Sequence, residues 1–564
     1  MDATVKLRYP GRASDNVAED DAFHSIFFDD LKPYLDVAIH GISATLLIDA
    51  FMCFCSLPPL PTTGIQPGWW SDPFLQRHWH LSTSSVEPTH FTQTLKRFSA
   101  CPVKRFQMTT ELLFQEDFSL GGINLSPGFI RRLLKLLVLE SMLSRDVFGE
   151  YLLAFECHHF PNDVFKTAKI LLKGQPMHSR LYNAYGLFES SFGNSAKADQ
   201  VFHTVLFMRH GNTASLTSET LELFTNWVWE ALLRGEQTEA WWRLTSHTNP
   251  PTQRAKNVQP DNSPIDSART TLMEMSERAL LDHEYAIAVR SSALLALLTY
   301  FSNDCNAEQA LEVHHSLSAW FVSHKLSNSP PAEIQAQEIA RFLTHHVAHA
   351  PIVKPSLIRT TLEPLISRFP NNTILLSLYA ANEARFSIDD RVRGIMHQNT
   401  LHSSEERSIA GWAFAIHYEM LKGEISGSTS HSIRALYKRA IDSTGAHCPA
   451  LWKAYVHFEL AQLERERARR TSKSLRHEGK KSKWGARIEE AEQRVKDTFY
   501  AGLKNLPWCK EYIMLVFTDA KDVFGDVEKW KLSRVLLEKE LRLYVELDSD
   551  DSWRTAEKEG WVSG

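Results

Sequence analysis

Residues 451–460 read LWKAYVHFEL, and residues 411–420 read GWAFAIHYEM. In each stretch a pattern begins with a tryptophan at the second position, has an aromatic or small residue at every third position after it, and ends with a glutamate at the ninth. Residues at this spacing share one face of a helix. The positions that carry the pattern are Trp412, Tyr418 and Glu419 in one copy, Trp452, Tyr455, Phe458 and Glu459 in the next, and Tyr182, Tyr185, Phe188 and Glu189 in an earlier one.

This pattern predicts an all-α fold, a solenoid of helix pairs. Helix pairs that recur roughly every 35 to 45 residues are typical of solenoids, in which each repeat contacts its neighbours. A second amphipathic run at 434–441 lies between the two tryptophan helices and supplies the partner helix. The alternative is an ordinary helical domain whose aromatic stripes form its core. In either case we interpret the repeated aromatic residues as core and not as ligand contacts.

Composition limits the class of protein. The chain has 564 residues, of which 43% are hydrophobic and 23% charged, as expected for a folded protein. A net charge of −5 argues against tight non-specific binding of nucleic acid by the whole surface, although a local basic patch stays open. Seven cysteines indicate reduced thiols in cytosol or nucleus. The apolar stretch 39–54 contains His40 and Asp49, so we expect a buried helix there.

Proline, glycine and charge clusters divide the chain. We predict a flexible lead at 1–22, N-terminal helical repeats at 23–245, and a linker or loop at 246–267, where Pro250, Pro251, Pro260 and Pro264 interrupt the pattern. C-terminal repeats follow at 268–547, with a basic insert at 464–487. An acidic and loose tail is expected at 548–564.

The basic insert is the strongest candidate for a binding site. Arginines and lysines there could contact RNA phosphates, Trp484 could stack on a base, or the segment could serve in nuclear import. A solvated helix or loop without a ligand is the other interpretation. The candidate contacts are Arg465, Arg467, Arg469, Arg470, Lys473, Arg476, Lys480, Lys481, Lys483, Trp484 and Arg487.

No motif predicts catalysis, a cofactor or a metal. The chain has no phosphate-binding Gly-rich loop and no nucleophile elbow. His345, His346 and His349 have a helical spacing that could hold a metal, and the adjacent Cys157, His158 and His159 could also do so, but neither group has a carboxylate motif beside it. We therefore expect a protein that is not an enzyme, has no cofactor and binds no small-molecule substrate.

The repeats resemble half-a-tetratricopeptide (HAT) repeats, through the tryptophan helices and the paired helix at 434–440. Short motifs narrow the resemblance to the NRDE-two family (nuclear RNAi defective, necessary for RNA interference). They are FFDD at 27–30, LPPLP at 57–61, FPNNT at 369–373, NEAR at 382–385, DDRVR at 389–393, FYAGL at 499–503, LPWCK at 506–510 and EKELR at 538–542.

The resemblance implies a non-enzymatic nuclear scaffold of RNA surveillance, splicing and nuclear RNA silencing, with links to heterochromatin. It implies protein partners, among them an exosome-associated RNA helicase and splicing factors, and no membrane. Direct RNA binding through 465–487 is the alternative function. In the family the helicase-binding segment lies in an N-terminal extension, whereas this sequence begins close to the repeats, so the resemblance assigns that contact to no residue here.

Overall fold

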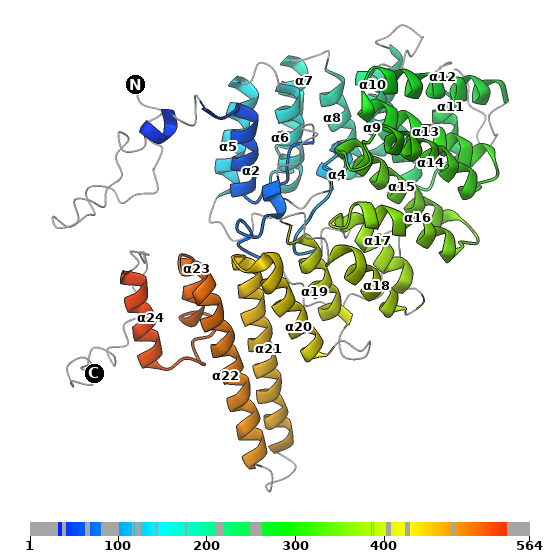
Figure 1. Ribbon diagram of the computed structural model, residues 1–564. Helices are drawn as coiled ribbons and strands as arrows, with labels where there is room; N and C mark the ends of the chain where they lie inside the picture. The colour runs from blue at the N-terminus through cyan, green and yellow to red at the C-terminus, as the bar shows by residue number, and fades with distance from the viewer. Residues whose placement is uncertain are drawn as a thin grey trace.

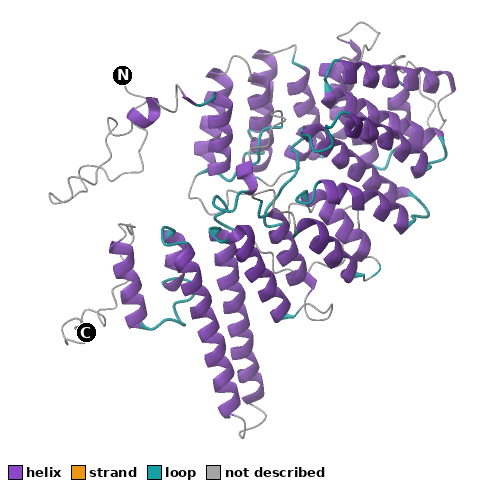
Figure 2. Cartoon of the chain, in the orientation of Figure 1, coloured by secondary structure: helices purple, strands orange, loops and turns teal. Residues whose placement is uncertain are grey.

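The computed structural model describes residues 32–36, 41–61, 68–79, 101–115, 118, 126–140, 145–174, 178–208, 218–246, 262–384, 386, 388–401, 408–422, 429–474 and 481–538. Every regular element within these ranges is a helix (Figure 2). The predicted all-α fold is therefore confirmed. The flexible lead at 1–22 and the acidic tail at 548–564 lie outside the described residues.

The helices follow one another with short connections. The first half contains α2 (Ala44–Phe54), η3 (Gly68–Ser71), α4 (Thr110–Leu113), α5 (Pro127–Glu140), α6 (Arg145–His159), α7 (Val164–Gly174), α8 (Ser179–Ser191), α9 (Ser195–His203), η5 (Thr204–Met208), α10 (Ser218–Leu233) and α11 (Gln237–Thr245). The middle contains α12 (Asn262–Leu281), α13 (Tyr285–Ser302), α14 (Ala307–Ser323), α15 (Pro330–His349), α16 (Pro355–Arg368), α17 (Thr373–Ala384), α18 (Asp389–Ile395) and η6 (Met396–Thr400). The last part contains α19 (Ala410–Lys422), α20 (Ser430–Ala440), η8 (Ile441–Gly445), α21 (Pro449–Ser474), α22 (Lys481–Asn505), α23 (Lys510–Ile513), η10 (Met514–Val516) and α24 (Asp526–Glu538).

The helices form two layers of a solenoid. Most helices pack against their successors, and helices of the same layer also pack against one another: α6 on α8, α8 on α10, α10 on α13, α13 on α15, α15 on α17 and α17 on α19. The array curves from α5 through α13 to α24 in the shape of a C (Figure 1). The helical-repeat architecture predicted from the tryptophan pattern is therefore confirmed, whereas the assignment of the repeats to the HAT type stays a prediction.

The apolar core is shared between neighbouring repeats. One cluster of buried side chains extends from Met52 to Tyr418. A second contains Val103 and extends from Ile409 to Leu532. The two clusters meet at α19, where Phe414 and Tyr418 belong to the first and Trp412 belongs to the second. Of the repeated aromatic positions, Tyr182 is partly exposed; Tyr185, Phe188, Trp412, Tyr418, Trp452, Tyr455 and Phe458 are buried.

Within the region predicted to be a linker, 246–267, α12 already begins at Asn262, and residues 247–261 lie outside the described part. Leu244 before this region and Ile265 within it belong to the same core cluster. The described helices on the two sides therefore share one apolar core.

Several helices of the array, among them those with the closing glutamates Glu419 and Glu459, have a buried glutamate that pairs with a basic residue. An arginine 24 to 26 residues earlier, on the preceding helix, donates to it in four repeats. The Nε–Oε1 distances are 2.6 Å for Arg131–Glu156, 3.1 Å for Arg359–Glu383, 2.7 Å for Arg393–Glu419 and 2.6 Å for Arg434–Glu459. A buried carboxylate needs such a partner, since desolvation of an unpaired charge is costly. The pair thus fixes how two helices of a repeat meet.

Glu189 fulfils the same role with a different partner. Lys197 and Asn194, both just beyond the end of α8, donate to its carboxylate. Burial raises the pKa of Glu189, but hydrogen bonds from Lys197, Tyr185 and Asn194 outweigh it and hold the pKa below its ordinary value. The helix ends at Ser191, and Gly193, directly before Asn194, has a φ of +79° that suits glycine.

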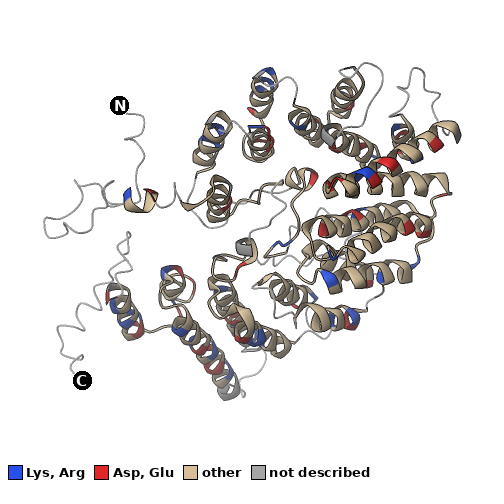
Figure 3. Ribbon diagram, turned by 45° about the horizontal axis from the view of Figure 1, so that its top comes forward, with Lys and Arg blue, Asp and Glu red and all other residues tan. Residues whose placement is uncertain are grey.

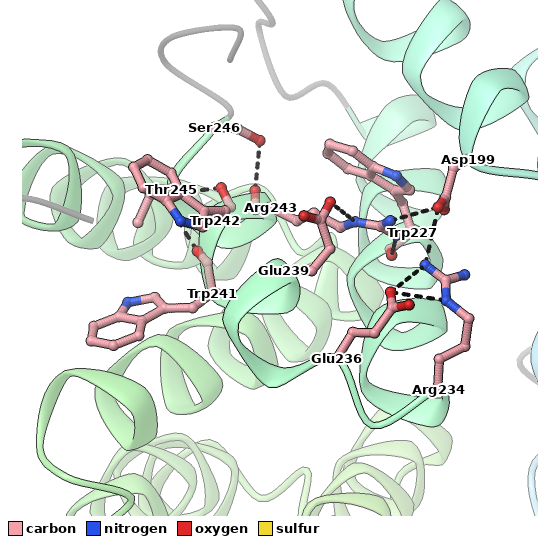
Figure 4. A network of polar contacts seen from close by, with 10 residues as sticks. All are labelled: Asp199, Trp227, Arg234, Glu236, Glu239, Trp241, Trp242, Arg243, Thr245 and Ser246. Atoms are coloured by element: carbon pink, nitrogen blue, oxygen red, sulfur yellow. Dashed lines mark hydrogen bonds and ion pairs between the residues drawn. The ribbon is translucent and has the colours of Figure 1, made fainter. Parts of the chain in front are cut away.

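A larger polar network joins α9, α10 and α11 (Figure 4). Arg243 is only 2% exposed and donates to the carbonyl of Trp227 at 2.6 Å. Its guanidinium also pairs with Asp199 at 2.9 Å and lies 4.8 Å from the ring centroid of Trp227. Since a guanidinium has donors on several sides, one arginine connects three consecutive helices.

The repeat ion pair makes a testable contribution to stability. Glu459→Ala should lower the free energy of unfolding by roughly 3 kcal/mol, because Arg434 loses the partner of a largely buried pair. Glu308→Ala is the matched control: this carboxylate pairs with Lys354 at 2.9 Å on the surface, where such pairs contribute about 1 kcal/mol or less. Urea unfolding followed by circular dichroism measures both. Equal costs for the two variants would show that the recurring geometry of the pair does not stabilise the repeat.

Candidate functional site

Two N-terminal segments cross the space that the C-shaped array encloses (Figure 1). We call residues 68–79 and 101–115 the strap. Backbone carbonyls of the strap accept hydrogen bonds at the start of three helices: Arg105 from the N–H of Thr373 at 2.9 Å, Ser71 from Ile409 at 3.0 Å, and Gln76 from Ala450 at 3.0 Å. The first N–H groups of a helix have no acceptor within the helix. The strap therefore caps α17, α19 and α21 from a distant part of the chain.

Side chains strengthen the strap at α15. The N–H of Gln107 donates to Gln337 Oε1 at 2.7 Å, and Gln337 Nε2 donates back to the carbonyl of Gln107 at 2.9 Å. Gln107 Nε2 also donates to Glu333 at 2.8 Å. This reciprocal pairing satisfies buried polar groups on both sides.

Aromatic rings hold the rest of the strap. Trp70 meets Phe106 edge-on with 5.8 Å between centroids, so the two halves of the strap contact each other. Phe74 packs on Trp508, which lies just before α23, at 4.7 Å. Sequence reasoning gave no partner for these rings, because nothing in a short irregular segment specifies which distant helix it meets.

A charged cluster anchors the strap at α23. Glu511 pairs with Lys453 at 3.0 Å, with His78 at 3.4 Å and with Arg77 at 3.6 Å. The hydrogen bond with His78 and the charge and hydrogen bond of Lys453 lower the pKa of Glu511 from 4.5 to about 2, against the effect of burial.

This cluster predicts acid sensitivity. A carboxyl group with a lowered pKa stabilises the fold above its unfolded pKa of 4.5, and this contribution is lost as the pH falls towards about 2. The wild type should therefore lose stability relative to Glu511→Gln over that interval. Lys453→Met should reduce the same loss, because a partner of the carboxylate is gone. Urea unfolding at a series of pH values tests this, and parallel profiles for wild type and Glu511→Gln would contradict it.

A cavity of about 230 Å³ lies where α4, which is part of the strap, meets α10 and α15. Its apolar walls come from Leu112, Leu232, Leu233, Ile334, Ala348 and Ile374. Its polar lining includes Thr109, Glu111, Trp229, Glu338, Arg341 and His345. Leu233 is 59% exposed, so the cavity reaches solvent beside it. We call this the α10–α15 cavity.

Acidic groups outnumber basic ones in this lining. Arg341 Nη1 lies 3.3 Å from Glu111 Oε1 and 3.7 Å from Glu338 Oε1, and its guanidinium covers the Trp229 ring at 4.0 Å. Burial raises the pKa of Glu338, and the charge of Glu111 adds to the rise although Arg341 opposes it. One arginine thus serves two carboxylates.

Further buried charges continue from the cavity along the inner helices. Arg180 of α8 pairs with Glu150 of α6, and Arg290 of α13 pairs with Glu222 of α10 at 3.2 Å. Burial raises the pKa of Glu150 to about 6 despite Arg180. The charges of Arg290 and Arg180 outweigh burial at Glu222 and lower its pKa.

Of the three histidines at 345–349, His345 and His346 are buried, whereas His349 is exposed. Tyr300 Oη lies 3.0 Å from His346 Nδ1, and the His345 ring meets Trp229 edge-on at 6.1 Å. Burial, with His349 and His346 nearby, lowers the pKa of His345 to about 3, so it is neutral at pH 7. In the part of the chain that the structure describes, no three His, Cys, Asp or Glu side chains come together as a metal site.

The basic insert forms the distal end of a long hairpin made of α21 and α22, which extends beyond the neighbouring helices (Figure 1). Arg465, Arg467 and Arg469 lie on α21, and Arg487 lies on α22. Arg467 pairs with Glu492 at 2.7 Å and Arg469 with Glu466 at 2.7 Å. Arg470 and Lys473 belong to α21, and Lys481, Lys483 and Trp484 to the start of α22, but their side chains are not described. Arg476 and Lys480 lie outside the described residues.

Acidic and basic residues alternate along the hairpin (Figure 3). Two of the predicted RNA contacts, Arg467 and Arg469, are therefore already paired with glutamates. Arg465 and Arg487 are exposed.

One helix of the described residues, α13, has the length and hydropathy of a membrane span. It is 61% buried and lies among α10, α12, α14 and α15. These contacts account for its apolar composition as that of a core helix. The apolar stretch at 39–54 contains α2, whose Met52 belongs to the core.

Comparison with known proteins gives related sequences. The profile of a family described as "NRDE-2, necessary for RNA interference" matches residues 1–60. A mouse protein named Nuclear exosome regulator NRDE2 is 26% identical over 217 residues, which are 34% of this chain and 15% of the relative. The resemblance to the NRDE-2 family is confirmed.

Two more NRDE-2 proteins match at similar levels. The human Nuclear exosome regulator NRDE2 is 23% identical over 209 residues, 34% of this chain and 15% of the relative. The protein of the same name from Dictyostelium discoideum is 23% identical over 207 residues, 35% of this chain and 13% of the relative. The matches thus span about a seventh of the curated NRDE-2 relatives. No solved structure is significantly similar to the chain.

The described end of the NRDE-2 profile match contributes to the fold. Leu57 and Leu60 are buried in the first core cluster, and the Tyr151 hydroxyl donates to the carbonyl of Pro58 at 2.7 Å. The family segment therefore packs directly on α6, immediately before the strap begins.

Proposed function

We propose that this chain is a non-enzymatic nuclear scaffold that binds proteins acting with the nuclear exosome in RNA surveillance. The observation that carries the proposal is the similarity to three proteins named Nuclear exosome regulator NRDE2. The helical solenoid supports it, because stacked helices offer an extended surface to segments of other proteins. An exosome-associated RNA helicase and splicing factors are the partners we propose, with roles in splicing, nuclear RNA silencing and heterochromatin regulation.

The physical basis of such a scaffold is rigidity. A partner bound to a pre-organised surface does not have to order that surface, so less of the binding free energy is lost. Here ion pairs within repeats and the strap across repeats hold the inner helices in place. The same elements would place two partners at a fixed distance from each other.

Affinity purification from nuclear extract tests the proposal. The tagged chain should enrich exosome subunits or the exosome-associated helicase over a tag-only control, both before and after nuclease treatment, because the contacts are between proteins. Immunofluorescence should place the chain in the nucleus. Failure to enrich any exosome component in both conditions would contradict the scaffold proposal.

Direct RNA binding is the second candidate, and the position of the α21–α22 hairpin favours it. Arginines on both helices lie at an end that projects from the array. Such an end can approach a phosphate backbone without contact from the rest of an acidic molecule.

Filter binding with single-stranded and structured RNA tests this candidate. Replacing Lys480, Lys481 and Lys483 with Gln should weaken binding across sequences and flatten the salt dependence, since fewer counterions are released. Trp484→Ala should cost a further ~1–3 kcal/mol if a base stacks there. The control is the triple Gln variant of Lys166, Lys169 and Lys173, which are exposed on α7. No RNA binding by the wild type at ~0.15 M salt would eliminate this candidate.

A further inference from the structure

The α10–α15 cavity contains buried polar atoms without partners. Glu111 Oε2, Glu338 Oε2, His345 Nε2 and Thr109 Oγ1 make no hydrogen bond with any described residue. All four side chains line the cavity and are 6–7% exposed. Since buried polar groups in folded proteins are nearly always paired, these atoms indicate a group that the cavity is shaped to receive.

The unpartnered atoms define the charge of that group. Two are carboxylate oxygens, and the hydroxyl oxygen of Thr109 also accepts hydrogen bonds. His345 is neutral at pH 7, so its ring can accept as well. Within the lining Arg341 faces both glutamates, and Arg290, which lies outside the lining, also acts on both through its charge. With Glu150, Glu222 and Arg180 included, the buried cluster sets four carboxylates against three guanidiniums, which leaves one excess negative charge when all are ionised. A cation with several donors satisfies this set, and an anion does not.

The volume of the cavity and its apolar walls limit which cation it can bind. A volume of about 230 Å³ is below the roughly 300–1,000 Å³ of pockets for drug-sized ligands, so it suits one side chain. Apolar walls beside the carboxylates match the methylene stem of a long basic side chain. A guanidinium has five donors against three in an ammonium, which fits four separate acceptors better.

We propose that the α10–α15 cavity binds an arginine side chain of an extended segment in a partner protein. The guanidinium pairs with Glu111 Oε2 and Glu338 Oε2, and its stem lies against Leu232 and Ile334. Trp229 Nε1 is a donor with no acceptor among the described residues and suits a carbonyl of the bound segment. The mouth beside the exposed Leu233 provides the entry. This inference rests on the proposed scaffold function and names the chemistry of a partner.

Fluorine NMR of protein labelled with 5-fluorotryptophan tests the proposal at the cavity itself. The chain has 15 tryptophans, so the Trp229 signal is assigned by its loss in Trp229→Phe. N-acetyl-arginine methylamide should shift this signal in a saturable way, with a Kd on the order of 1 mM for so small a probe. The citrulline analogue, which has the same shape without the charge, should not shift it at equal ionic strength.

Substitution of the cavity glutamates tests whether they bind the arginine probe. Glu338→Gln should weaken the binding of the arginine probe about tenfold or more, because a charge-assisted hydrogen bond is lost. Glu312→Gln, on the exposed face of α14, should leave it unchanged. If Glu338→Gln does not fold by circular dichroism, Glu111→Gln provides the same test.

Three results would overturn the proposal: no saturable shift with arginine, an equal shift with citrulline, or unaltered affinity in the folded glutamine variant. Tighter binding of N-acetyl-lysine methylamide would overturn the assignment to a guanidinium. The readout is independent of the exosome. Enrichment of exosome proteins without a response to arginine therefore refutes only this inference, and a response to arginine without enrichment refutes only the scaffold function.

Discussion

The hydrogen bonds from helix N-termini to the strap are the contacts on which the arrangement of the array depends. A solenoid ordinarily consists of local contacts, because each repeat touches only the next. In this chain, the backbone carbonyls of Ser71, Gln76 and Arg105 accept hydrogen bonds from helices hundreds of residues later. Gln107 adds a hydrogen bond to Gln337 on α15. The curvature of the array is thus restrained from its inside as well as by the packing between neighbours.

Two kinds of polar contact hold the inner helices in place. The Arg–Glu pairs, such as Arg393–Glu419, act within a repeat and set the angle between two adjacent helices. The strap acts across several repeats at once, from α15 and α17 to α21 and α23. The α10–α15 cavity lies where the two systems meet, since Glu111 comes from the strap and Glu338 and Arg341 come from an inner helix. A rigid frame on both sides explains how carboxylates stay buried there without collapse of the space between them.

The sequence predicted the repeats well and the strap poorly, for physical reasons. Trp452, Phe458 and Glu459 reveal their roles because helical periodicity places an apolar stripe and one buried acid on a recognisable face. Even so, the pattern does not name the arginine partner, which becomes apparent only from the constant separation of 24 to 26 residues. The strap acts through backbone carbonyls, which every residue possesses, so no residue type signals it. The cavity could not be predicted from the sequence either, because its lining comes from segments more than 200 residues apart.

The strap also affects how the protein folds while the ribosome synthesises it. Lys453 contacts His78 across 375 residues, and Thr373 contacts Arg105 across 268. At a synthesis rate of roughly 5–20 residues per second, the strap emerges tens of seconds before the helices that it caps. Repeats can form one after another as they leave the tunnel, and the inner contacts can then close in steps, first at α15 and α17 and last at α21 and α23. During translation the C-terminal part of the array is therefore the last to have its curvature fixed.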